Sequence, residues 1–316
     1  MFTRFKYIML IVLLLFNYSL SQIGGKAGAF SRLGFGSRGM GMGNAMSAIT
    51  SGNISTYYNP ALIPFTENRT INITYSFLSL DRYLNFLSYG QSIKPSAGVS
   101  FGLINSGVRN IEERDSDGNI LGKLNTSENL FFLSFGNQLN KNLSIGITFK
   151  LFYYKLYSGI SSTTVGFDLG FLTKLTSSST IALTIKDINS KYQWNTTSIY
   201  GRAGTSTKDQ FPRLLILSFS YKLPYELGLA SIEFENSTAK TNQLRIGSEI
   251  LLHKNFIIRA GIDRFVYSNS YSGIKPTFGY SLNFDIDKIS TSLDYAYVIE
   301  SFSPGNIHII TLSFIF

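Results

Sequence analysis

Few residues of this chain could perform chemistry. It contains two histidines, His253 and His308, and no cysteine. The absence of cysteine excludes disulfides, thiol catalysis, cysteine zinc sites and a lipid-modified N-terminal cysteine. His253 falls in a predicted turn and His308 at the start of the last predicted strand, and neither has a serine or carboxylate placed to form a triad. We therefore predict no catalytic residue, no metal site, no cofactor and no enzymatic activity.

Three local patterns could still indicate ligand sites. The run 34–39 (GFGSRG) matches the dinucleotide-binding pattern, but no strand precedes it and no βαβ unit surrounds it, so we reject this interpretation. Asp115 and Asp117 could bind calcium, although the EF-hand pattern is incomplete and a solvated hairpin tip is the favoured alternative. An aromatic loop with Tyr192, Trp194 and Tyr200 either contacts a partner or packs on itself.

Composition and the N-terminus indicate an exported protein. Charged residues make up 15% of the 316 residues and hydrophobic residues 44%, whereas soluble chains carry about 25% charged residues. A basic start, an apolar run over about 7–16 and small residues near position 20 predict a signal peptide over 1–21. That run is too short for a membrane-spanning helix. The net charge of +9 is dispersed, so we predict no nucleic-acid partner.

From Thr70 onward the hydrophobic pattern has a period of two. Between 142 and 157, for example, Leu143, Ile145 and Ile147 alternate with Ser144 and Gly146. Such alternation predicts strands, most of them as long as a tilted membrane strand requires. The predicted strands are about 70–79, 83–93, 96–105, 127–139, 142–157, 161–175, 178–188, 211–223, 227–237, 241–252, 255–267, 273–286, 289–301 and 306–316.

The connections between these strands alternate in length. The two long ones, about 106–126 and 189–210, follow odd-numbered strands, whereas six short ones follow even-numbered strands. This parity is typical of outer-membrane barrels, which have tight periplasmic turns and longer outer loops. We predict an all-β protein, a monomeric 14-stranded antiparallel transmembrane β-barrel in the bacterial outer membrane, in contact with outer-membrane lipid.

The polar face of the strands should line the lumen. Both charge signs occur there, which predicts ion pairs that hold the barrel or grip a plug. The last strand alternates up to Phe314 and the terminal Phe316, a pattern that resembles the signal read by the barrel assembly machinery. The predicted lumen residues are Lys150, Asp168, Lys186, Glu233, Glu235, Arg245, Glu249, Arg259, Asp263 and Asp294.

Residues 22–66 do not alternate and are rich in glycine. Closely spaced glycines permit positive φ and close backbone approach, which suits a hatch or plug folded against the barrel wall; a periplasmic arm is the alternative. The predicted organisation is a signal peptide (1–21), a hatch or plug (22–66) and the barrel (67–316). The hatch motif comprises Gly39, Gly41, Gly43, Asn44, Asn59, Pro60 and Ala61.

Three runs in this segment resemble a known family. They are 30–34 (FSRLG), 38–45 (RGMGMGNA) and 58–61 (YNPA), and they resemble the N-terminus of the PorV/PorQ family, which groups with the FadL-type transporters. The resemblance implies an Asn-Pro-Ala element in an N-terminal hatch ahead of a 14-stranded barrel. It also implies an outer-membrane role in type IX secretion, with a PorV-like or a PorQ-like subtype left open.

We therefore expect a non-catalytic barrel that handles secreted proteins during export or surface attachment. Its partners would be secreted cargo with a C-terminal sorting domain and subunits of the secretion system. The alternative is a FadL-like transporter of hydrophobic small molecules, which would need an apolar pocket and a lateral opening. An open polar porin is a third possibility, disfavoured by the glycine-rich segment.

Overall fold

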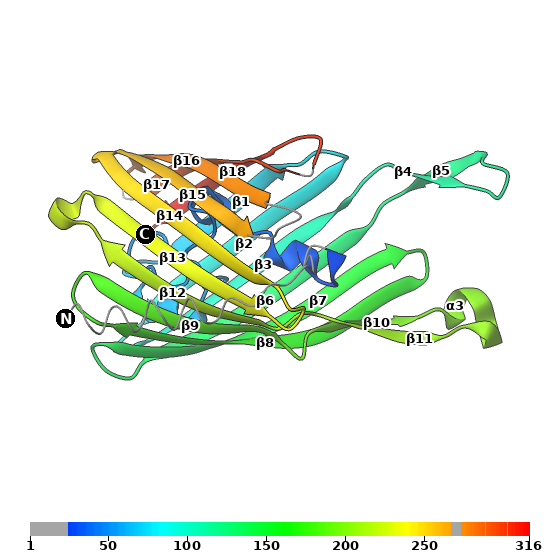
Figure 1. Cartoon of the computed structure of the whole chain (residues 1–316), viewed down its shortest axis with the longest axis horizontal. Coiled ribbons are helices and arrows are strands. Elements are labelled where there is room, and N and C mark those ends of the chain that lie inside the picture. The colour runs from blue at the N-terminus through cyan, green and yellow to red at the C-terminus, as the bar shows by residue number, and fades with distance from the viewer. Residues whose placement is uncertain (1–24, 267–272, 288, 302) are drawn as a thin grey trace.

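The chain forms a closed antiparallel β-barrel (Figure 1). The computed structural model describes residues 25–266, 273–287, 289–301 and 303–316. The predicted signal peptide, 1–21, lies outside the described residues. Fourteen strands pair in the order β1-β18-β17-β16-β15-β14-β13-β12-β9-β8-β7-β6-β3-β2, and the pairing of β1 with β18 closes the barrel. The predicted fold class and strand number are confirmed.

The wall strands agree closely with the alternating runs of the sequence. Their bounds are β1 Thr70–Phe77, β2 Arg82–Ile93, β3 Ala97–Val108, β6 Ser127–Gln138, β7 Leu143–Tyr157, β8 Ile160–Lys174, β9 Ser179–Ile188, β12 Leu214–Lys222, β13 Gly228–Ser237, β14 Asn242–His253, β15 Phe256–Val266, β16 Gly273–Ile286, β17 Ile289–Val298 and β18 Ile307–Ile315. The expected start of one strand at 211 was wrong, because Phe211 is buried inside the barrel mouth before β12 begins.

Two long loops contain strands of their own, which the sequence analysis did not anticipate. β4 (Ile111–Arg114) pairs with β5 (Ile120–Leu124), and β10 (Lys191–Asn195) pairs with β11 (Ser206–Gln210) around α3 (Thr197–Tyr200) and η4 (Gly201–Ala203). Both hairpins project beyond one end of the barrel (Figure 1). The other end carries the tight turns, including η5 (Pro224–Glu226). Within the described ranges no helix is long and apolar enough to cross a membrane.

The outer surface of the barrel carries a lipid-like band. Outward positions on adjacent strands are in register, for example Ile73 with Leu87 and Phe131 with Leu151. These side chains are 42–51% exposed. Inward neighbours such as Ser134 and Thr148 are buried and hydrogen bonded to each other. A closed barrel leaves no unpaired edge in hydrocarbon, which a spanning sheet requires.

The N-terminal segment (25–66) lies inside the barrel. It contains η2 (Ala29–Arg32), α2 (Gly36–Gly41) and η3 (Pro60–Phe65). α2 contacts β15 to β18, and η3 contacts β2, β3, β6, β7 and β8 on the opposite wall. The segment therefore bridges the lumen from one wall to the other.

Candidate functional site

The N-terminal segment is bound to one side of the lumen by charged groups, which we call the charged arc. These are the inward residues of β13 to β17: Glu233, Glu235, Arg245, Glu249, Arg259, Asp263, Lys275 and Asp294. Arg38 of α2 donates from Nε and Nη2 to the two carboxylate oxygens of Glu249, at 2.9 and 3.0 Å. Glu249 also accepts from Arg259 Nε at 2.6 Å, and Arg259 reaches Asp294 at 3.0 Å.

Two more residues of the segment bind the charged arc. The side-chain amide of Asn44 donates to Asp263 at 2.8 Å, and Asp263 also contacts Arg245 at 3.3 Å. The backbone N–H of Ser47 donates to Glu233 at 2.5 Å. Hydrogen bonds that involve a charged group are about twice as strong as neutral ones and are directional. They therefore fix the orientation of the segment as well as its position.

A second charged group lies on β7 to β9. Lys150 forms ion pairs with Asp168 at 2.7 Å and with Asp187 at 2.9 Å. The ammonium of Lys186 lies 4.2 Å from the centre of the Tyr57 ring, a cation–π contact with the N-terminal segment. All of the lumen residues predicted from alternation are buried. In the charged arc and in the group on β7 to β9, these residues bind one another or the N-terminal segment.

The hatch-motif residues shape the segment itself. Asn59 caps η3 by accepting from the Ala61 N–H at 2.9 Å, and its amide donates to the Ser47 carbonyl at 2.9 Å. Pro60 occupies the first turn, where its missing N–H costs nothing. Gly43 has φ +59° and lies against the backbone of Ile262. Only glycine tolerates both this backbone conformation and this approach.

Four glycines of the barrel wall leave room for the N-terminal segment, a feature that the sequence analysis missed. Gly98, Gly136, Gly146 and Gly170 are direct cross-strand neighbours on β3, β6, β7 and β8, and we call them the glycine row. A Cβ atom on any of them would collide with 59–63 of the segment. The signal was present in the sequence as an inward glycine on each of four strands, but it became visible only with the register.

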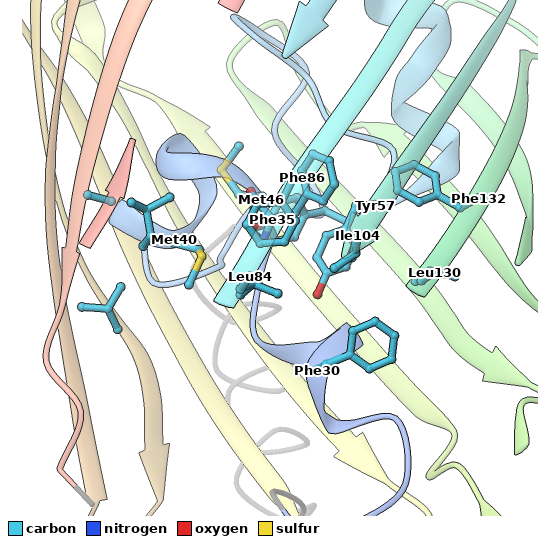
Figure 2. Packing of buried hydrophobic residues seen from close by; sticks show 14 of the residues in the cluster. Phe30, Phe35, Met40, Met46, Tyr57, Leu84, Phe86, Ile104, Leu130 and Phe132 are labelled. Atoms are coloured by element: carbon cyan, nitrogen blue, oxygen red, sulfur yellow. Dashed lines mark hydrogen bonds between the residues drawn. The ribbon is translucent and has the colours of Figure 1, made fainter. Parts of the chain in front are cut away.

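Toward the long-loop end, the opposite side of the lumen carries a cluster of apolar side chains that we call the aromatic arc. It comprises the buried inward hydrophobic residues of β2, β3, β6 and β7, whereas the same strands carry buried polar residues such as Ser100 and Ser134 closer to the tight turns. The residues of the aromatic arc are Leu84, Phe86, Ile104, Leu130, Phe132 and Phe152. Phe35 of the segment packs against Phe86 and Phe132, with ring centres 4.8 and 5.8 Å apart, and stacks on Tyr57 (Figure 2). The contact of Phe35 with these rings involves no hydrogen bond, whereas closer to the tight-turn end Thr56 bonds to Ser100 of β3 at 2.7 Å and Ser144 of β7 donates to the Ala61 carbonyl at 2.8 Å.

The aromatic arc continues outward to the β10–β11 hairpin. Phe152 contacts Phe211 and Phe211 contacts Tyr192, with ring centres 4.9 and 4.8 Å apart. Trp194 packs on Tyr192 at 5.3 Å. Of the three residues predicted for partner contact, Tyr192 is buried, Trp194 packs within the chain, and Tyr200 is 64% exposed. The partner role remains a prediction.

A polar chamber of about 470 Å³ lies at the tight-turn end. The segment contributes Arg38 and Asn53 to its lining, and the turn between β14 and β15 contributes Lys254 and Asn255. A second and much smaller space of about 20 Å³ lies between the segment and the wall, lined by Tyr57, Lys186 and Arg245 among others.

The remaining residues singled out in the sequence make hydrogen bonds within the chain itself. Asp115 accepts from the backbone N–H groups of Asp117 and Asn119, and the Asn119 side chain holds the pKa of the Asp115 carboxyl below its usual range. That carboxylate closes its own hairpin tip. His308 bonds to Tyr295. Phe316 pairs with Arg69 through backbone hydrogen bonds, and a role of Phe314 and Phe316 as assembly signal remains a prediction.

Known structures with the same architecture are outer-membrane barrels. The chain resembles the Pseudomonas putida toluene transporter TodX, with a TM-score of 0.58, 13% identity, and coverage of 89% of this chain and 96% of that one. It also resembles a Pseudomonas aeruginosa FadL homologue, with a TM-score of 0.61, 12% identity, and coverage of 89% and 98%. No protein-family model and no curated protein matches the sequence.

The likeness is one of fold. This chain has the architecture of the FadL-type outer-membrane barrels, and with its apolar outer band it is a protein of the bacterial outer membrane. The tight-turn end is therefore the periplasmic end and the projecting hairpins are extracellular.

Proposed function

We propose that this protein is an outer-membrane transporter of hydrophobic small molecules in which residues 22–66 act as a hatch that closes the lumen. The observation that carries the proposal is the division of the lumen. The charged arc binds the segment by directional bonds, whereas the aromatic arc offers an apolar surface from the extracellular hairpin down to Phe35. The transporter TodX, with the same fold, supports the same class of function.

The proposed route follows the aromatic arc. A hydrophobic ligand would enter beside Trp194 and Tyr192, displace the rings of Phe30 and Phe35 from the wall, and pass while the charged arc retains the hatch. Apolar burial is non-directional, so such contacts exchange one apolar partner for another at little cost. The 470 Å³ chamber on the periplasmic side leaves space toward which the hatch can shift.

The single tryptophan provides the test, because Trp194 packs on Tyr154 and Tyr192 at the proposed entrance. Titration of the protein in nanodiscs with toluene or oleate should change Trp194 fluorescence saturably, and proteoliposomes should take up the same compounds faster than protein-free vesicles. Glucose should have neither effect. Equal uptake with and without protein would contradict the proposal.

A protein-handling role of the PorV/PorQ type is the second candidate. It is favoured by the two hairpins that project beyond the barrel (Figure 1) and by exposed apolar side chains on them, including Leu121 and Tyr200 at 64% each. Purification of a tagged copy from native outer membranes, with mass spectrometry of co-purifying proteins and lipids, separates the two candidates. Stoichiometric secreted proteins with a shared C-terminal domain would favour this second role over transport.

A further inference from the structure

Three asparagines stand side by side on the outside of the barrel. Asn85 of β2 pairs with Asn105 of β3, which pairs with Asn129 of β6. Their sequence neighbours Leu84, Ile104 and Leu130 are fully buried inside, so the amides face outward. Tyr75 and Tyr153 continue the row on both sides. We call these five residues the amide row.

The amide row lies on the extracellular side of an apolar row on the same strands. One outward position closer to the periplasm lies the apolar row of Ile73, Leu87, Leu103, Phe131 and Leu151. One position farther out on β7 is the exposed Lys155, and beyond the end of β3 the Arg109 guanidinium lies over the Tyr83 ring at 4.7 Å. On β7 the outward order toward the extracellular end is therefore hydrocarbon, phenol and cation, whereas on β1 the exposed Phe77 follows Tyr75.

The hydrogen bonding of the row is incomplete. Asn105 donates to Asn129 at 2.7 Å, and Asn129 donates to Ser127 at 3.0 Å. The side-chain oxygen of Asn85 has no hydrogen-bond partner within the described part of the chain, and its neighbours cover it, so the side chain must rotate before this oxygen can accept from an outside donor.

We propose that the amide row, with Arg109 and Lys155, binds the phosphorylated sugar headgroup of an outer-leaflet glycolipid. Directly paired residues lie about 5 Å apart, so the three amides span about 10 Å, the size of a disaccharide. Amide groups recognise sugar hydroxyl and amide groups, and the two cations complement phosphate. Phospholipid headgroups of the inner leaflet lie at the other end of the barrel. This inference does not depend on the transported ligand.

The test measures lipid retained by the purified barrel. Wild-type protein and the triple variant N85A/N105A/N129A are incubated with deep-rough lipopolysaccharide or with cardiolipin in detergent, washed, and analysed by mass spectrometry. Wild-type protein should retain lipopolysaccharide in preference to cardiolipin. The triple variant should lose about tenfold of that retention, which corresponds to 1.4 kcal/mol. R109Q/K155Q should lower retention and flatten its dependence on salt.

The matched control is N236A/N242A, because Asn236 and Asn242 are outward amides that pair with each other on β13 and β14. It should retain lipopolysaccharide like the wild type. Heat-modifiable mobility checks assembly of every variant, and single N85A replaces the triple variant if that one does not assemble. Unchanged retention in the amide-row variants, equal loss in the control, or equal retention of cardiolipin would overturn the proposal.

Discussion

The charged arc and the aromatic arc hold the same N-terminal segment by different physics. On the charged arc, Arg38, Asn44 and Ser47 each reach a buried carboxylate at 2.5–3.0 Å. On the aromatic arc, Phe35 contacts Phe86 and Phe132 by ring packing, and Tyr57 stacks on Phe35. Aromatic pairs contribute about 0.5–1.5 kcal/mol beyond burial and tolerate sliding, whereas a broken buried ion pair leaves an uncompensated charge.

These contacts hold the segment more firmly on the charged arc than at the rings of the aromatic arc. Movement away from the charged arc must break several charge-assisted bonds at once. Movement of Phe35 away from the aromatic arc breaks no charge-assisted bond and exposes apolar surface that a hydrophobic ligand would cover again. In the proposed function the two arcs therefore have separate roles, retention of the hatch and passage of the ligand.

Removal of the central carboxylate should have the largest effect. Glu249→Ala leaves both Arg38 and Arg259 without their shared partner, and we expect a loss of about 3–5 kcal/mol in the stability of the closed state. Planar-bilayer recordings should show more frequent and larger openings than the wild type. Glu249→Gln, which retains the shape, should have a smaller effect. A silent Glu249→Ala channel with unchanged thermal unfolding would show that this ion pair does not retain the hatch.

Filling the glycine row should have the next largest effect. In Gly146→Val the new side chain meets the backbone of Pro60 and Ala61, and we expect overpacking to cost about 1–3 kcal/mol. Trypsin should then cleave the N-terminal segment faster. Gly122→Val in the β4–β5 hairpin is the matched control, since a Cβ there makes only an ordinary contact with Glu113. Identical cleavage of both variants and the wild type would contradict seating by the glycine row.

A change in the aromatic arc should have the smallest effect on stability and a clear one on uptake. Phe132→Leu removes the ring contact with Phe35, and we expect a loss of about 0.5–1.5 kcal/mol with altered uptake of aromatic relative to aliphatic compounds. Phe131→Leu, on the lipid-facing side of the same strand, is the control. If both variants take up toluene and oleate in the wild-type ratio, the ligand does not follow this arc.

The period of two predicted most of this architecture. Ion pairs were predicted among the charged lumen residues, and the side chains of two of them, Arg259 and Glu249, form such a pair with an Nε–Oε2 distance of 2.6 Å. Side-chain alternation fixes which face a residue occupies, so burial of the charges followed from the sequence. The partners of Arg38 and Asn44 could not be predicted, because these bonds join residues 211 and 219 positions apart.

The glycine row and the amide row show the same limit. Gly98, Gly136, Gly146 and Gly170 are scattered in the sequence, and so are Asn85, Asn105 and Asn129. Each set becomes one feature only when antiparallel register sets strands side by side. The β4–β5 and β10–β11 hairpins were missed for another reason: each strand has only four or five residues, and apart from Tyr192 these residues are exposed or half-buried.

Disulfides that fix the N-terminal segment to the barrel wall test the proposed hatch most directly. Because the chain contains no cysteine, no native thiol would interfere with the introduced pairs. Two pairs of hydroxyl groups join the segment to the wall. The Ser37 hydroxyl of α2 lies 2.8 Å from that of Thr311 of β18, and the Thr56 hydroxyl lies 2.7 Å from that of Ser100 of β3. With all four residues changed to cysteine and both bridges closed, uptake of toluene and oleate by proteoliposomes should stop, and reduction should restore it. Uptake at the wild-type rate in the oxidised, doubly bridged protein would contradict the hatch, because ligand would then pass without movement of the segment.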